Sequence, residues 1–248
     1  MLAGLAAAAL TAAGVLAAGT ASASEERPAP PATPAAGSAA VPKHALTGYW
    51  QNFDNGATVQ KLKDVDDAYD IIAVSFAEAA GRPGAVTFTL DPAVGYGSVD
   101  DFTADIRAKQ AAGKSVILSV GGEKGAVSVN DDASARNFAD SVGKLMDTYG
   151  FDGVDIDLEN GLDASGLDPS QVGIGVPASP GAAGSGHVAP SVVNAALDCL
   201  TRGTDCGSFK PPKTYPGLRG AMTWSTNWDA AGGNEIAGQV GAHVHGLP

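Results

Sequence analysis

The sequence predicts an α/β fold, most simply a (β/α)8 barrel of the TIM type that is incomplete and has about six β/α units. Apolar strand-like segments alternate with helix-like segments from residue 45 onward, which is typical of a parallel sheet. The alternation breaks at residues 161–170, GLDASGLDPS, where Gly and Pro interrupt the chain and no apolar face is present. A parallel crossover needs about a dozen residues and usually a helix, so this segment cannot carry one.

The alternation gives each element an expected position. Strands are expected at residues 45–53, 70–77, 115–120, 151–160, 171–176 and 220–226. Helices are expected at residues 58–67, 99–112, 132–149 and 191–202. Residues 70–77, DIIAVSFA, form a nearly continuous apolar run, which indicates a strand buried on both faces. The last three helices are each followed by glycine, at Gly113, Gly150 and Gly203, which is a typical helix stop signal.

Three regions are expected along the 248 residues. Residues 1–23 read as a signal peptide, because an apolar run at residues 2–18 is followed by the small-residue site Ala21-Ser22-Ala23. The alternative is a transmembrane anchor, although the run is short for one. Residues 24–42 are rich in Pro and Ala and read as a linker. Residues 43–248 are expected to form a catalytic domain that is truncated internally after residue 160.

The net charge and the cysteine content argue against several classes of binding partner. The formal net charge of −12 argues against a nucleic-acid or anionic-membrane surface. No Cys/His cluster has metal spacing, so we expect no metal and no cofactor. A secreted, extracellular, monomeric protein is expected, without membrane association after signal cleavage. Export would allow a Cys199–Cys206 disulfide in an oxidising compartment, and two free thiols are the alternative.

The segment at residues 151–160, FDGVDIDLEN, carries the strongest chemical signal. Residues two apart on a strand share a face, with Cα atoms roughly 6.6–7 Å apart. One face is therefore apolar (Val154, Ile156 and Leu158), and the other carries three acids (Asp155, Asp157 and Glu159). Neighbouring carboxylates repel each other and favour shared protons. This repulsion destabilises the fold. A catalytic role for the carboxylates explains why it is tolerated better than a solvated acidic edge strand does.

These residues resemble glycoside hydrolase family 18. Residues 152–159, DGVDIDLE, match the DGxDxDxE signature of that family, and residues 119–122, SVGG, match its SxGG motif at the end of strand three. Residues 48–50, 74–78 and 220–229 resemble strands one, two and eight of secreted actinobacterial-type chitinases, and residues 172–180 resemble strand seven. The resemblance passes directly from strand four to strand seven. The region of strands five and six, with its Met-Gln-Tyr-Tyr-Asn-like motif, has no counterpart.

The resemblance implies a retaining, substrate-assisted hydrolysis. Glu159 would act as general acid and then general base, and a raised pKa would suit that role. Asp157 would hold the acetamido group of the sugar, and Asp155 would support Asp157, with Ser119 as a partner. The substrate-binding set implied by the resemblance also includes Trp224 as an aromatic floor, Tyr49 and Phe76 as pocket walls, and Gly121 and Gly122. Core packing is the alternative for each of the three aromatic residues.

The sequence therefore predicts an exported glycosidase that hydrolyses β-1,4-N-acetylglucosamine linkages, with chitin or chitooligosaccharides as its partner and substrate. Family 18 also includes enzymes that act on N-glycan cores, so the signature leaves that substrate open. The competing hypothesis is a catalytically impaired chitin-binding relative or an internally deleted fragment. Loss of one oriented contact to the acetamido group can lower the rate by about 10²–10³-fold.

Overall fold

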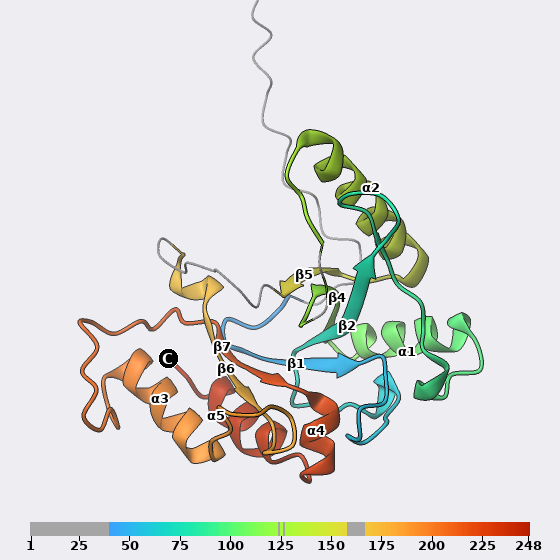
Figure 1. Cartoon of the computed structure of the whole chain (residues 1–248). Coiled ribbons are helices and arrows are strands. Elements are labelled where there is room, and N and C mark those ends of the chain that lie inside the picture. Colours follow the sequence, from blue (N-terminus) through green and yellow to red (C-terminus); the bar gives the residue numbers. More distant parts are fainter. Residues whose placement is uncertain (1–39, 124, 126, 158–166) are drawn as a thin grey trace, which may run out of the picture. The chain divides into compact units, whose positions relative to one another are not determined.

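The computed structural model describes residues 40–123, 125, 127–157 and 167–248, and its framework is a parallel sheet (Figure 1). The strand order is β5-β4-β2-β1-β7-β6. The bounds are β1 (Ala45–Gln51), β2 (Ile71–Ala79), β4 (Ser115–Gly121), β5 (Gly153–Asp157), β6 (Gly173–Pro177) and β7 (Gly220–Trp224). A two-residue strand, β3 (Val86–Thr87), pairs antiparallel with β2. All other pairings are parallel, which confirms the predicted fold class.

The sheet is open between β5 and β6. These strands stand at the two ends of the strand order, and each pairs with one strand among those described, β5 with β4 and β6 with β7. A closed barrel would join the two ends through further strands. Six parallel strands with a gap at this point form an incomplete β/α barrel, and the gap lies where the sequence alternation breaks.

The main helices begin and end where local sequence signals place them. They are α1 (Val99–Ala111), α2 (Asp132–Tyr149) and α3 (Pro190–Arg202), and two short helices, α4 (Thr226–Ala231) and α5 (Ala242–His245), follow later. Ser98 caps α1 by accepting a hydrogen bond from the backbone N–H of Asp101. Asp131 and Ser134 form a capping box at the start of α2. Gly150 and Gly203, both at positive φ, end α2 and α3.

One predicted helix is wrong. Residues 58–67 form only a single 3₁₀ turn, η1 (Leu62–Asp64). The backbone of this segment is bound by distant side chains instead, because the Trp50 indole donates to the Gln60 carbonyl at 3.0 Å and the Leu62 N–H donates to the Tyr96 hydroxyl at 2.7 Å. Tertiary contacts therefore override the local helix propensity. Two further 3₁₀ turns are η2 (Pro92–Val94) and η3 (Pro169–Gln171), and η4 (Ile236–Gly241) is a π-helix.

The main core lies between α1 and one face of the sheet. Its fully buried members include Leu46, Trp50, Ile72, Val74, Leu118, Phe102 and Ile106. The rings of Trp50 and Phe102 stack with centroids 5.6 Å apart. Burying an apolar side chain of this size contributes about 1.5–3 kcal/mol. This packing fixes the central strands β1, β2 and β4, and the opposite face of the same strands carries the candidate site.

The apolar face of β5 is exposed. Val154 and Ile156, which the sequence places together on this face, are 40% and 45% exposed. In a complete barrel the helix of the following unit covers this outer face. Here the next described element after β5 is the short turn η3, which leads into β6 at the far end of the strand order. The outer face of β5 therefore remains in contact with solvent.

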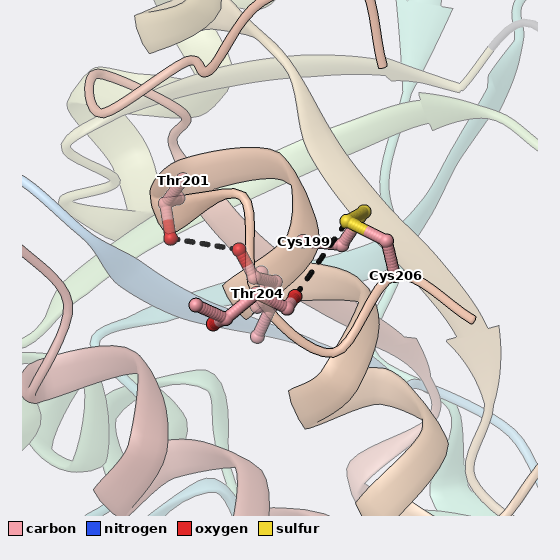
Figure 2. The surroundings of a disulfide bond; sticks show 5 residues. Cys199, Thr201, Thr204 and Cys206 are labelled. Atoms are coloured by element: carbon pink, nitrogen blue, oxygen red, sulfur yellow. Dashed lines mark hydrogen bonds between the residues drawn. A yellow bond between two sulfur atoms is a disulfide. The ribbon is translucent and has the colours of Figure 1, made fainter. Parts of the chain in front are cut away.

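A disulfide closes the end of α3 (Figure 2). Cys199, in the last turn of the helix, is bonded to Cys206, and the S–S distance is 2.11 Å. The chain turns back at Gly203, whose φ of 78° lies in the left-handed region that favours glycine. Thr201 donates its hydroxyl to the Leu197 carbonyl within the same helix end.

Candidate active site

The strand register places one row of polar side chains on the face opposite α1. Gln51 of β1 pairs with Ser75 of β2, Ser75 with Ser119 of β4, and Ser119 with Asp155 of β5. Partners in a parallel register point to the same face, and side chains alternate along each strand. Tyr49, two residues before Gln51, therefore belongs to this face too. Four strands of the sheet supply the row, so its geometry depends on the complete central sheet.

Asp155 is held by two hydroxyl donors. The Ser119 hydroxyl donates to its Oδ2 oxygen at 2.7 Å, and the Tyr49 hydroxyl donates to the same oxygen at 2.9 Å. Burial, followed by the charges of Asp155 and Asp157, raises the pKa of Tyr49 well above its ordinary value. The phenol therefore stays protonated and remains a donor. Two donors on one oxygen fix the orientation of the carboxylate.

An aromatic cluster stands beside this carboxylate. The rings of Phe76 and Trp224 are nearly parallel, at 9°, with centroids 5.6 Å apart. Tyr49 lies 5.7 Å from Trp224 and 6.2 Å from Phe76. Phe53 stacks on Trp224 from 6.3 Å. The structure thus brings the three predicted aromatic residues together, and it adds Phe53, which the sequence did not single out.

A cleft of about 1120 Å³ opens over these residues. Its lining includes Asp157, Trp224, Phe76, Gly121 and Gly122, all of which were predicted, and also Phe53, Glu78 and Glu123, which were not. The volume slightly exceeds the usual range for small-ligand sites, about 300–1,000 Å³, and suits an extended ligand.

The two glycines are required by space as well as by conformation. Gly121 has a φ of +122°, and a Cβ there would lie 2.2 Å from the Asp157 carbonyl oxygen. Gly122 has a φ of +78°, and its Cβ would lie 2.8 Å from the Phe76 ring. Side chains at these positions would displace the Asp157 backbone and the aromatic wall. Their role in this structure is to let β4, β5 and Phe76 approach closely.

Several predicted features lie outside the described residues. Glu159 and Leu158 follow Asp157 directly and fall in this group, as do residues 1–39. Within the described ranges, no group of three or more His, Cys, Asp or Glu side chains is arranged to hold a metal ion. No helix in the same ranges is long and apolar enough to cross a membrane.

The cleft residues that were not predicted from the sequence occupy equivalent places, at the carboxyl ends of strands. Phe53 and Glu78 follow Gln51 and Phe76 by two residues, at the carboxyl ends of β1 and β2. Active sites of β/α barrels form at these carboxyl ends. A spacing of two residues from Gln51 and from the predicted Phe76 could have identified both as cleft residues, whereas Ser75 is out of phase with Phe76 because the register of β2 shifts between Ser75 and Ala77. Glu123 follows the glycine pair at the end of β4, where the same rule applies.

Comparison with known proteins identifies the fold and the family. The model of glycosyl hydrolases family 18 matches residues 45–171, just over half of the chain. A Streptomyces coelicolor structure assigned as chitinase A is 51% identical, with a TM-score of 0.79 over 83% of this chain and 99% of that one. A family GH18 chitinase from Chromobacterium violaceum is 31% identical, with a TM-score of 0.73 over 84% of this chain and 85% of that one.

The curated relatives contain residues that this chain lacks. Chitinase D of Niallia circulans is 28% identical over 326 aligned positions, which cover 82% of this chain and 62% of the relative. Exochitinase 1 of Streptomyces olivaceoviridis is 29% identical over 81% of this chain and 56% of the relative. For chitinase D, 82% of 248 residues is about 203, so about 120 of the 326 aligned positions have no residue of this chain opposite them.

The matched region therefore spans less than two thirds of the length of these relatives, and the alignment skips an internal stretch. Among the described strands, the sheet is open between β5 and β6. The family match, the two related structures and the strand order agree with one another. The chain belongs to glycosyl hydrolases family 18 and lacks part of the barrel.

Proposed function

We propose that this protein hydrolyses β-1,4-N-acetylglucosamine linkages of chitin or chitooligosaccharides by a retaining, substrate-assisted mechanism. The acetamido oxygen of the bound sugar attacks its own anomeric carbon, and Glu159 donates a proton to the departing glycosidic oxygen. Asp157 orients the acetamido group and stabilises the positive charge of the oxazolinium. Water then opens this ring as Glu159 takes a proton from it.

The observation that best supports this proposal is the Asp155 carboxylate held by Tyr49 and Ser119 below a cleft that contains Asp157 and Trp224. A carboxylate fixed by two donors can orient its neighbour two residues along the strand without moving itself. Trp224, half-buried against Phe76, presents the kind of aromatic surface on which a sugar ring can stack.

A second function is favoured by the open sheet. About 120 aligned positions of a relative are absent, and β5 and β6 have no described partner strand on their outer sides. A protein that keeps the cleft but lacks part of the barrel would bind chitin and turn it over slowly or not at all. This alternative predicts retention on chitin without release of product.

A fluorogenic chitotriose substrate separates the two functions. The unmodified protein is compared with Glu159→Gln and with Glu235→Gln, a matched control at an exposed position outside the cleft. Loss of the general acid is expected to lower turnover by about 10²–10⁴-fold, while the control keeps it. Equally slow release by the unmodified protein and Glu159→Gln would reject hydrolysis and favour the binding protein.

We also propose that the protein is exported and acts as a secreted, extracellular protein. The apolar segment at residues 2–18 and the following small-residue site support this. The Cys199–Cys206 disulfide adds support, because disulfides persist mainly in oxidising compartments. Recovery of the full-length gene product from culture medium, with its new N-terminus determined, tests the proposal. Retention of the product inside the cell would contradict it.

A further inference from the structure

A second, smaller cavity of about 360 Å³ adjoins the candidate active site. Three residues line both spaces: Phe53, Phe76 and Glu78. Phe53 and Phe76 also stack on Trp224, so the cavity lies one aromatic ring beyond the predicted sugar floor. Its volume falls within the range of small-ligand sites. A ligand that extends past Trp224 on this side would enter it.

One wall of this cavity is rigid. The Asn52 side chain donates to the Thr89 carbonyl at 2.8 Å, and its Oδ1 accepts the Asp91 N–H at 3.0 Å. The nitrogen and the oxygen of the Asn52 side-chain amide therefore both hold residues 89–91 against the end of β1. Asn52 is itself buried. A wall fixed by both ends of a buried amide is pre-organised for binding and does not have to be ordered by the ligand.

Another part of the lining carries an acid, Glu78. Glu78 and Thr87 are cross-strand partners of β2 and β3, and both line the cavity. Within the described ranges, no side chain forms a hydrogen bond or ion pair with the Glu78 carboxylate. A neighbouring lining residue, Asp91, uses Oδ1 to accept the N–H of Ala93. The described lining therefore contains two carboxylates and no Lys, Arg or His.

We propose that this cavity binds a glucosamine unit, whose amine is cationic, next to the N-acetylglucosamine that reacts at Trp224, so that the preferred substrate is partly deacetylated chitin. The inference rests on the proposed function. The reacting sugar must keep its acetamido group, because that group supplies the nucleophile, but a sugar beyond it need not. Phe53 and Phe76 offer apolar surface for the sugar face, and Glu78 offers a charge-assisted contact to the ammonium.

Three tetrasaccharides test this inference by calorimetric titration. One is fully acetylated, and the other two carry a single glucosamine unit at the reducing or the non-reducing end. All titrations use the full chain with Glu159→Gln, which prevents hydrolysis, at about pH 6, where ammonium and carboxylate groups of ordinary pKa are both charged. The readout is the ratio of affinities for the glucosamine-containing and fully acetylated ligands.

One of the two glucosamine-containing ligands is expected to bind about two- to fivefold more tightly than the acetylated one, the range for an exposed charge pair. Adding Glu78→Gln should bring this ratio close to one, while adding Glu235→Gln should preserve it. Raising the salt from roughly 0.02 M to roughly 0.5 M should also reduce the ratio. Equal affinity for all three ligands, or a preference that Glu78→Gln leaves intact, would overturn the inference.

Failure of the inference and failure of the proposed function give different results. Turnover of the chitotriose substrate by the protein with Glu159 intact reports only on the function. Turnover with an affinity ratio of one would reject the glucosamine site and leave the hydrolase. A preference that depends on Glu78, without turnover, would reject the hydrolase and assign the site to a chitin-binding protein.

Discussion

Replacing Tyr49 with Phe removes one of the two hydroxyl donors that orient Asp155. The hydroxyl donates to Asp155 Oδ2 at 2.9 Å, and the ring packs against both Phe76 and Trp224. Phe keeps that ring packing, so the substitution isolates the hydrogen bond. The Ser119 hydroxyl remains on the same oxygen at 2.7 Å.

A hydrogen bond to a charged acceptor contributes about 1.5–3 kcal/mol. If that orientation is used in the transition state, Tyr49→Phe lowers kcat by about 10- to 100-fold, since each 1.36 kcal/mol is tenfold. The free energy of unfolding should fall by only about 1 kcal/mol, because Asp155 is half-buried and water can replace part of the lost contact. Chitotriose turnover and urea unfolding measure the two effects separately.

The matched control is Tyr215→Phe, since no hydrogen bond of the Tyr215 hydroxyl is found in the described part of the chain. Ser119→Ala combined with Tyr49→Phe should show a coupling energy, because both donors act on one oxygen. Turnover within twofold of the unmodified protein for Tyr49→Phe would refute the idea that this bond orients the catalytic carboxylates. Full additivity of the two substitutions would refute the shared-acceptor argument.

Three further outcomes are expected. Ile156→Thr on the open face of β5 should change the free energy of unfolding by less than about 0.5 kcal/mol, whereas Leu118→Ala in the core should cost about 2–5 kcal/mol; similar costs in urea unfolding would mean that the face of β5 is covered. Reduction of Cys199–Cys206 should lower stability by about 2.5 kcal/mol on the chain-entropy estimate for so short a loop, and an unchanged melting temperature with reductant would contradict this. Lys109 lowers the pKa of Asp67. The pair therefore stabilises the protein above about pH 4, and this stabilisation is lost as the pH falls. If the free energy of unfolding of Asp67→Asn falls with decreasing pH as steeply as that of the unmodified protein, the contribution of the pair is disproved.

Local signals in the sequence were sufficient for the main elements. Alternating apolar and amphipathic segments predicted the parallel sheet, and capping residues predicted the helix ends at Gly150 and Gly203. The family signature at residues 152–159 predicted membership of glycosyl hydrolases family 18. Even the gap was visible, because residues 161–170 lack the apolar face that a crossover helix needs.

Long-range contacts decided the local features that the sequence did not predict correctly or did not reveal. The segment at residues 58–67 has a helical pattern, but Trp50 and Tyr96 bind its backbone and leave only one 3₁₀ turn. The exposure of Val154 and Ile156 goes with the position of β5 at one end of the described strand order, which strand alternation cannot reveal.

The sequence by itself determined the element types, the family and three acids at alternate positions, because these depend on residues close together along the chain. The resemblance also implied Ser119 as a partner of Asp155, and the structure shows this hydrogen bond. Only the tertiary structure decided the other contacts: Tyr49 on the same oxygen of Asp155, Phe53 beside Trp224, and Glu78 on the wall of a second cavity. Those contacts join strands that are tens of residues apart in the chain. Their geometry follows from sheet register and side-chain packing, which no single segment specifies.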